Sequence, residues 1–471
     1  MAKLGVSHMV ETIVLVAFAT MLLTGIAIGI PLWMPLLAGL ALFFGYGLHD
    51  GATPRRLVSL MGEGMRSLAP ILALFAIIGA LTAVWRAAGT LPLVMAWSAA
   101  SVRPGTLVLA TFLGCVVVSF VTGSSFSAAA TIGVAFMAIG RAMGADAALM
   151  GGAILSGSVF GDRCSPLSSS AMLVCELTGS DPSENLRRTA LFSCVPLLVA
   201  CGAYATLGIG AGAGAVVPDL ASALRQGFVL SPVVAVPLVV LLALSLARVR
   251  VHLVMLASLA SALGIAILVQ GADPAMLVRA MLVGYASPDA AIGPVVDGGG
   301  MASMLEVGVV VLIVSAYSGL FRGTGLLRGL RDVVTRVAER TTPFLGVLLT
   351  AAVTEAVTCE QFVGIMLCSE ICSGCERSGK ALALDIENSA MVLPVLLPWS
   401  TDSIALTAFV GAPLSSAAFA VYPVAVIGLG ICLSLWQRSH PGFVASHAAR
   451  PFGLEACDNA WAERQAEGRL A

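Results

Sequence analysis

The sequence has 471 residues, of which 58% are hydrophobic and only 11% are charged, and its formal net charge is −1. A chain this apolar lies far outside the average of soluble globular domains and is typical of membrane proteins. Because the net charge is near zero and no basic run is present, the composition excludes nucleic-acid binding as a function class.

Apolar stretches long enough to cross about 30 Å of hydrocarbon recur along the chain. The first, Val10 to Ile30, has no clear small-residue cleavage site, so we interpret it as a span and not as a signal peptide. Further spans are predicted at residues 32–49, 68–88, 188–212, 231–247, 252–269, 301–321 and 416–436.

Other stretches are apolar but interrupted by polar residues, glycine or proline, namely 106–142, 145–178, 343–376 and 379–412. Non-helical backbone at membrane depth persists only where protein or a water-filled cavity satisfies it, so these interruptions are candidate substrate sites. The arms of 106–142 hold about sixteen residues and reach roughly 24 Å, which predicts a re-entrant hairpin there and in 343–376. Stretches 145–178 and 379–412 are predicted to be broken transmembrane helices.

Short strings recur in the same order in the two halves of the chain. Gly51-Ala-Thr-Pro matches Gly271-Ala-Asp-Pro, Val121–Phe126 matches Val357–Phe362, and Ser165–Ser169 aligns with Leu397–Thr401. This pattern predicts a duplication, with the first repeat at 1–212 and the second at 213–436. Each repeat would cross the membrane five times, and an odd number inverts the second copy. The expected fold is therefore an all-α polytopic membrane protein of two inverted repeats.

The distribution of basic residues predicts the orientation. With both termini in the cytoplasm, most basic residues fall on cytoplasmic loops, including Arg187, Arg188, Arg377 and Lys380, and the tail 437–471 is also cytoplasmic. The predicted outside loops carry only Arg86, Arg103, Arg141, Arg225 and Arg279. The expected location is the cell (inner) membrane.

In the first repeat, the hairpin tip contains Thr122, Gly123, Ser124 and Ser125, where the glycine permits a tight reversal and the hydroxyls offer lone pairs to a cation. In the broken helix we expect the first half to end near Gly161 and the second to begin at Pro166.

The charged pair of this predicted break is Asp162 and Arg163, with Ser165 as the cap of the second half and Ser168 and Ser169 beyond it. Because charge is costly in a bilayer, Asp162 has either a functional role or a structural one in which Arg163 neutralises it.

In the second repeat, the hairpin tip is Thr358-Cys359-Glu360-Gln361, with Glu355 one turn earlier. The broken helix carries Glu387, Asn388 and Ser389 ahead of Ser400, Thr401 and Asp402. Asp385 lies on the same helix face as Asn388 and Ser389, and we interpret it as a solvated charge near Lys380.

These strings resemble the NhaC-type sodium/proton antiporters of the ion-transporter superfamily. The resemblance covers both repeats, and its most specific piece is Gly161-Asp-Arg-Cys-Ser-Pro-Leu-Ser168. It implies hairpin tips and broken helices around one central site. The chain departs from the family at Ser169-Ser170-Ala171-Met172, where an Asp-Thr-Thr-Asn type run is usual, and at Glu360, where an asparagine is usual.

The function expected is alternating-access cation/proton antiport, most directly of sodium, in which Asp162, Glu360 and Glu387 hold either protons or the cation. The alternative is ion-coupled transport of a small organic anion, a dicarboxylate or an amino acid, with Arg163 facing its carboxylate. The partners expected are the monovalent cation, protons and membrane lipid, with a homodimer also considered.

Enzymatic readings are disfavoured. Cys368, Cys372 and Cys375 have the spacing of a radical-SAM iron–sulfur motif, but they follow an apolar helical run and not a soluble barrel. No histidine lies mid-membrane beside a serine. We expect no catalytic residue, no cofactor and no metal other than the transported cation.

Overall fold

The computed structural model describes residues 10–439, except positions 11, 12, 15, 23, 26, 27, 29, 32, 68, 102, 103 and 248 and the stretches 212–219, 289–292, 325–339 and 373–377. Within these residues the regular structure is helical, apart from one isolated bridge between Tyr285 and Gly298. Cys375 and the tail from position 440 onward lie outside the described residues.

The first half of the chain contains α2 (Trp33–His49), α3 (Pro54–Ser67), α4 (Ala69–Ala87), α5 (Thr90–Ser101), α6 (Pro104–Thr122), α7 (Ser125–Ala128), the π-helical turn η1 (Ala129–Gly133), α8 (Val134–Ala142), α9 (Ala147–Cys164), α10 (Ser169–Thr178) and α11 (Pro182–Ala211). The second half contains α12 (Leu220–Gly227), η2 (Pro232–Ala235), α13 (Val236–Leu246), α14 (Val251–Leu268), α15 (Pro274–Val283), α16 (Gly293–Val296), η3 (Met301–Met304), α17 (Leu305–Thr324), α19 (Pro343–Thr358), α20 (Gln361–Cys372), α21 (Gly379–Glu387), η4 (Pro394–Leu396), α22 (Thr401–Val410), η5 (Leu414–Phe419) and α23 (Val421–Ser439).

Several of these helices suit a bilayer by length and composition. Windows at 105–122, 182–209, 251–268 and 421–439 are long and apolar enough to cross a membrane, and shorter apolar helices accompany them. Large apolar side chains face outward, including Leu198 at 70% exposure and Leu268 at 85%. Such exposure suits contact with lipid, so the chain is an all-helical, multi-pass membrane protein.

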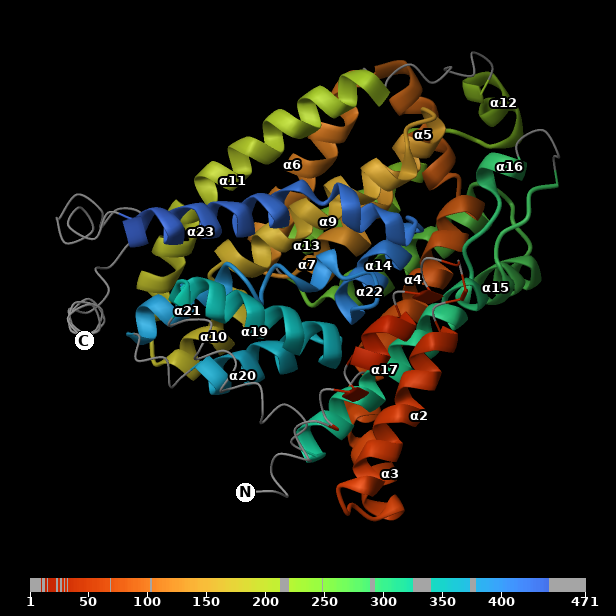
Figure 1. Ribbon diagram of the computed structural model, residues 1–471. Coiled ribbons are helices and arrows are strands. Elements are labelled where there is room, and N and C mark those ends of the chain that lie inside the picture. Colours follow the sequence, from red (N-terminus) through yellow and green to blue (C-terminus); the bar gives the residue numbers. More distant parts are fainter. Residues whose placement is uncertain are drawn as a thin grey trace, which may run out of the picture.

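Helices from the two halves pack on one another in a reciprocal way (Figure 1). Helices α2 and α3 lie against α17, whereas α14 and α15 lie against α4. The α3–α17 crossing is close because both sides present glycine. A Cβ on Gly64 would lie 2.1 Å from the carbonyl oxygen of Ser315, and one on Gly319 would lie 2.0 Å from that of Leu60.

Helix α9 is the central element, since nearly all its side chains are buried. Gly157 and Gly161, four residues apart, let α6 approach α9 closely. A Cβ on Gly157 would lie 2.5 Å from the carbonyl oxygen of Phe112, and one on Gly161 would lie 2.1 Å from the carbonyl carbon and oxygen of Ser119. The Ser119 hydroxyl also donates to the Gly157 carbonyl at 2.8 Å.

The first broken helix differs in detail from the prediction. Helix α9 continues past Gly161 to Cys164, so Asp162 and Arg163 lie in its last turn and not in the break. The second half begins at Ser169 with Ser168 as its cap, and not at Pro166 with Ser165 as cap. The break is therefore confined to residues 165–168.

The first arm of the first hairpin is longer than predicted. Helix α6 holds 19 residues instead of about sixteen and reaches about 28 Å, close to the hydrocarbon thickness. The arms of the second hairpin are shorter, with 16 residues in α19 and 12 in α20.

Candidate functional site

The tip of the first hairpin touches the break of the first broken helix. Gly123 ends α6 in a left-handed conformation, with φ of +68°. A Cβ at this position would lie 2.6 Å from the carbonyl carbon of Leu167, so only glycine fits. Beyond the tip, the Ser124 hydroxyl accepts the Ser127 N–H at 3.3 Å and caps α7.

Asp162 and Ser125 meet at this contact. The Asp162 side chain is 7% exposed, and its Oδ1 accepts the main-chain N–H of Ser125 at 3.1 Å. The Ser168 hydroxyl donates to the Asp162 carbonyl at 2.5 Å and ties the break to the same turn. The predicted proximity of Ser125 and Asp162 is confirmed, and it places a carboxylate at the start of a helix, where amide dipoles favour negative charge.

Arg163 connects the two halves of the chain. Its guanidinium is fully buried and donates from Nε to the Glu387 carbonyl at 2.8 Å. Nη1 donates to the Ser193 hydroxyl at 3.1 Å and to the Tyr422 hydroxyl at 2.7 Å, and Nη2 donates to Oδ1 of Asn388 at 2.5 Å. Thus Arg163 of α9 holds the C-terminal end of α21, with help from α11 and α23.

The alternative in which Arg163 neutralises Asp162 does not hold for the described residues, among which no ion pair joins the two side chains. Because α9 continues through Cys164, the two residues are adjacent on a helix, and neighbours at i and i+1 do not face each other. The carboxylate of Asp162 therefore has an amide partner and the guanidinium has uncharged partners.

Glu387 lies at the end of α21 and is fully buried. Its Oε1 accepts the side-chain N–H of Asn185, on α11, at 3.1 Å, and its Oε2 accepts no hydrogen bond from a described residue. The charges of Arg163 and Asp162 both act on it. The charge of Asp162 thus acts on Glu387 although the two residues lie in different halves of the chain.

The second hairpin tip repeats the turn of the first. Cys359 ends α19 in the left-handed conformation, with φ of +57°, and its carbonyl accepts the Thr401 N–H at 2.8 Å. Glu360 caps α20 by accepting the Phe362 N–H at 3.3 Å and the Val363 N–H at 2.8 Å. Glu360 is half-buried, and its carboxylate serves as the cap of α20.

Asp402 was not among the predicted site residues, although it follows Thr401 directly. It is 6% exposed in the first turn of α22, where Ser400 is the cap. The charges of Glu360 and Asp162 act on its carboxylate. Gln361 donates from Nε2 to the Met391 carbonyl at 3.1 Å. Two acidic side chains, Glu360 and Asp402, therefore act on each other near the second tip.

The remaining predicted residues are mostly buried around these contacts. Thr122, Thr358 and Ser389 hydrogen-bond to nearby main-chain carbonyls, whereas the Ser165 hydroxyl accepts the N–H of Leu167. Ser169 is exposed, so the structure does not bring it into the site.

Asp385 is 9% exposed, so its interpretation as a solvated charge is wrong. The side of α21 that carries Asp385 faces protein, even though Lys380, at the start of the same helix, is half-exposed at 48%.

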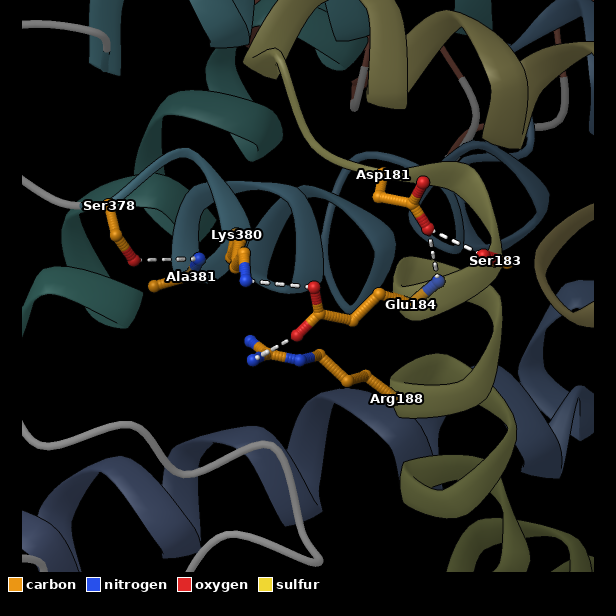
Figure 2. A network of polar contacts seen from close by, with 7 residues as sticks. All are labelled: Asp181, Ser183, Glu184, Arg188, Ser378, Lys380 and Ala381. Carbon is orange, nitrogen blue, oxygen red and sulfur yellow. Dashed lines mark hydrogen bonds and ion pairs between the residues drawn. The ribbon is translucent and has the colours of Figure 1, made fainter.

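At one end of this region, an ion-pair network joins α11 to α21 (Figure 2). Nζ of Lys380 lies 2.8 Å from Oε2 of Glu184, and Nη2 of Arg188 lies 2.9 Å from Oε1 of the same carboxylate. Asp181 begins α11 by accepting the Ser183 hydroxyl at 2.5 Å and the Glu184 N–H at 2.9 Å. Glu184 directly precedes Asn185, the partner of Glu387, and the network links the two halves of the chain.

The described residues contain no group of three histidine, cysteine or acidic side chains that could hold a metal ion. Hydroxyls are available instead. The Thr401 and Ser403 hydroxyls are buried at the start of α22 and have no hydrogen-bond partner among the described residues. A weakly bound monovalent cation can use such oxygen ligands together with one carboxylate.

The sequence matches a family model described as "Na+/H+ antiporter family", at residues 1–202 and 178–435. The chain belongs to this antiporter family. The predicted resemblance is confirmed, and the family consists of transporters and not of enzymes.

The chain aligns over most of its length with relatives that carry different names. The Na+/H+ antiporter NhaC of Alkalihalophilus pseudofirmus is 28% identical over 385 residues, which is 79% of this chain and 82% of the relative. The arginine/ornithine antiporter ArcD of Halobacterium salinarum is 27% identical over 425 residues, 84% of this chain and 85% of the relative. The malate-2H+/Na+-lactate antiporter of Bacillus subtilis is 24% identical over 380 residues, 78% of this chain and 80% of the relative.

Three residues of the candidate site were not predicted from the sequence, for different reasons. Asp402 stood within a string already singled out by its interruption. Asn185 is a polar residue in the first turns of a long apolar helix, and on that ground it could have been selected from the sequence as a functional candidate. Tyr422, at the start of α23, could not have been found, because its role depends on the reach of Arg163 from another helix.

Proposed function

We propose that the antiporter exchanges a monovalent cation, most directly sodium, for protons, with the cation bound at Asp162. The observation that carries this is the position of the Asp162 carboxylate, which is buried, supported by the Ser125 amide and not neutralised by a described basic side chain. A buried carboxylate in this setting needs either a proton or a cation as its counter-charge. Competition between the two couples their movements.

The environment of Arg163 argues against the alternative, transport of a small organic anion recognised by this residue. Its guanidinium already donates to the Glu387 carbonyl and to the side chains of Ser193, Tyr422 and Asn388. A substrate carboxylate would have to displace these bonds. The acidic character of the site fits a cation better. Two relatives are named for arginine/ornithine and for malate and lactate, so these compounds are included in the transport test.

We also propose that the two halves are inverted repeats, each with a re-entrant hairpin and a broken transmembrane helix. Equivalent local structures support this. Gly123 and Cys359 turn the two hairpins through the same left-handed conformation, and Ser168 and Ser400 cap α10 and α22. The reciprocal packing of α3 on α17 and of α15 on α4 fits an approximate two-fold relation.

Two experiments test these proposals. Proteoliposomes with an imposed pH gradient should lose it on addition of sodium, but not of malate, lactate or arginine. Collapse driven only by an organic substrate would overturn the cation proposal. For orientation, single cysteines replacing Lys380 and Arg225 in a cysteine-free background should react with a membrane-impermeant reagent from opposite sides. Reaction of both from one side would refute the inverted arrangement and the proposed cytoplasmic position of Lys380.

A further inference from the structure

Glu355 is a further buried carboxyl group, on α19 one turn before the tip of the second hairpin. Its side chain is fully buried, and neither Oε1 nor Oε2 accepts a hydrogen bond from a described residue. Buried polar groups are nearly always paired, and an unpaired one costs about 1–3 kcal/mol, more if it is charged. A group retained at this cost calls for an explanation beyond packing.

The facing helix leaves room for this carboxyl group. A Cβ on Gly364, in α20, would lie 2.0 Å from Oε1 of Glu355 and 2.3 Å from its carboxyl carbon. No other residue type could occupy position 364 without displacing the carboxyl. The two arms of the hairpin are therefore fitted together around the Glu355 side chain.

The charged groups that act on Glu355 are both acidic, namely Asp402 at the start of α22 and Glu360 at the tip. The Cys359 thiol also lies close enough for the charge of Glu355 to act on it. The other helices packed against α19 are α17, α21 and α23, and no titratable group on them contributes to the charges acting on Glu355. A negative charge on Glu355 thus meets neither a donor nor a described cation.

Asp402 is also a buried acidic group. It is 6% exposed in the first turn of α22, and its charge acts on Glu355. Two neighbouring buried carboxyl groups disfavour each other's ionisation, an arrangement suited to sharing a proton.

We propose that Glu355 is a proton-carrying site of the antiporter, separate from the cation site at Asp162, and that Asp402 exchanges protons with it. In this step the O–H bond of the Glu355 carboxyl breaks and its proton passes to the Asp402 carboxylate, so that Glu355 becomes the carboxylate and Asp402 the carboxylic acid. The inference rests on the proposed cation/proton exchange and adds a second protonatable residue, on which proton movement also depends.

The test uses Glu355→Gln, which keeps the shape and removes the titration, in proteoliposomes assayed in two ways. Sodium-driven proton movement should fall to the level of protein-free vesicles, while exchange of external for internal sodium, which needs no proton, should continue. Glu370→Gln, an exposed carboxyl on α20, is the matched control and should retain both activities. If Glu355→Gln moves protons with unchanged pH dependence, or loses sodium exchange as well, the proposal is overturned.

Two further variants keep the proposal testable if Glu355→Gln does not fold. Glu355→Asp keeps a titratable group in a shifted position and should move the pH midpoint of proton movement without changing sodium exchange, and an unchanged midpoint overturns the proposal. Gly364→Ala should likewise move this midpoint, because the added methyl displaces the carboxyl but leaves it titratable. Failure of wild-type protein to couple any cation to protons would instead refute the underlying antiport proposal.

Discussion

The main-chain N–H of Ser125 donates a hydrogen bond of 3.1 Å to Oδ1 of Asp162. This bond joins the tip of the first hairpin to the last turn of α9. It places the carboxylate at the N-terminal end of α7. Movement of either element must change the environment of the charge. If Asp162 holds the cation as proposed, this contact links ion occupancy to conformation.

Arg163 is expected to be a structural connector. Replacement by Met removes every hydrogen bond that Arg163 donates, and since bonds from a charged donor contribute about 1.5–3 kcal/mol each, the loss of stability should be several kcal/mol. Replacement by Lys should lower the stability less, but it should still destabilise the protein. An ammonium group cannot donate to all the acceptors that the planar guanidinium reaches. Thermal melting of purified protein in detergent measures both changes.

The same experiment separates this role from neutralisation of Asp162. If the two residues formed an ion pair, Asp162→Asn combined with Arg163→Met would be more stable than the sum of the single changes indicates. We expect no such rescue, and a clear rescue in the double variant would contradict the description of Arg163.

Gly161 sets the distance between α6 and α9. Gly161→Ala would place a methyl group 2.1 Å from the main chain of Ser119, so we expect a loss of at least about 1–3 kcal/mol from overpacking. The control is Gly202→Ala on α11, where a Cβ meets no atom within 4 Å and Ala should stabilise the helix by about 0.5–1 kcal/mol. Equal melting temperatures for the two variants would show that the close approach is absent.

The Lys380–Glu184 ion pair is partly exposed, with 48% and 38% exposure of the two side chains. Such pairs contribute at most about 1 kcal/mol, so Lys380→Met should hardly change the melting temperature. A transport rate that changes in Lys380→Met and returns when Lys380→Glu is combined with Glu184→Lys would show that the pair controls opening between α11 and α21. If the reversed pair behaves like Lys380→Met, the contact has no such role.

Asp181 gives a pH-dependent contribution at the start of α11. The Ser183 hydroxyl and the Glu184 amide hold the pKa of its carboxyl below the ordinary value of 3.8. The stabilisation is therefore present above that value and is lost as the pH falls through the lowered pKa of the folded state. The melting temperature of Asp181→Ala should lie below that of wild type at neutral pH and approach it in strong acid. A difference that grows on acidification would contradict this sign.

The sequence predicted the interrupted segments and the contact of the first tip with Asp162 well. Glycine, proline and polar clusters within an apolar run indicate an interrupted helix, because such a backbone needs protein or water around it in a membrane. It predicted helix ends less well. The extension of α9 to Cys164 changed the interpretation of Asp162 and Arg163, since residues adjacent on a helix point in different directions. A long arginine side chain that reaches another helix, or a glutamate fitted against Gly364, depends on tertiary packing that no local pattern contains.

The most direct test of the cation site compares wild type with Asp162→Asn in proteoliposomes that carry an imposed pH gradient. Asparagine still offers an oxygen to the Ser125 amide, so the variant should fold and insert, yet it cannot hold a charge-balancing cation or proton. We predict that sodium collapses the gradient in wild-type vesicles and leaves it intact in Asp162→Asn vesicles. Collapse at an unchanged rate and with unchanged pH dependence in the variant would contradict the assignment of Asp162 as the cation site.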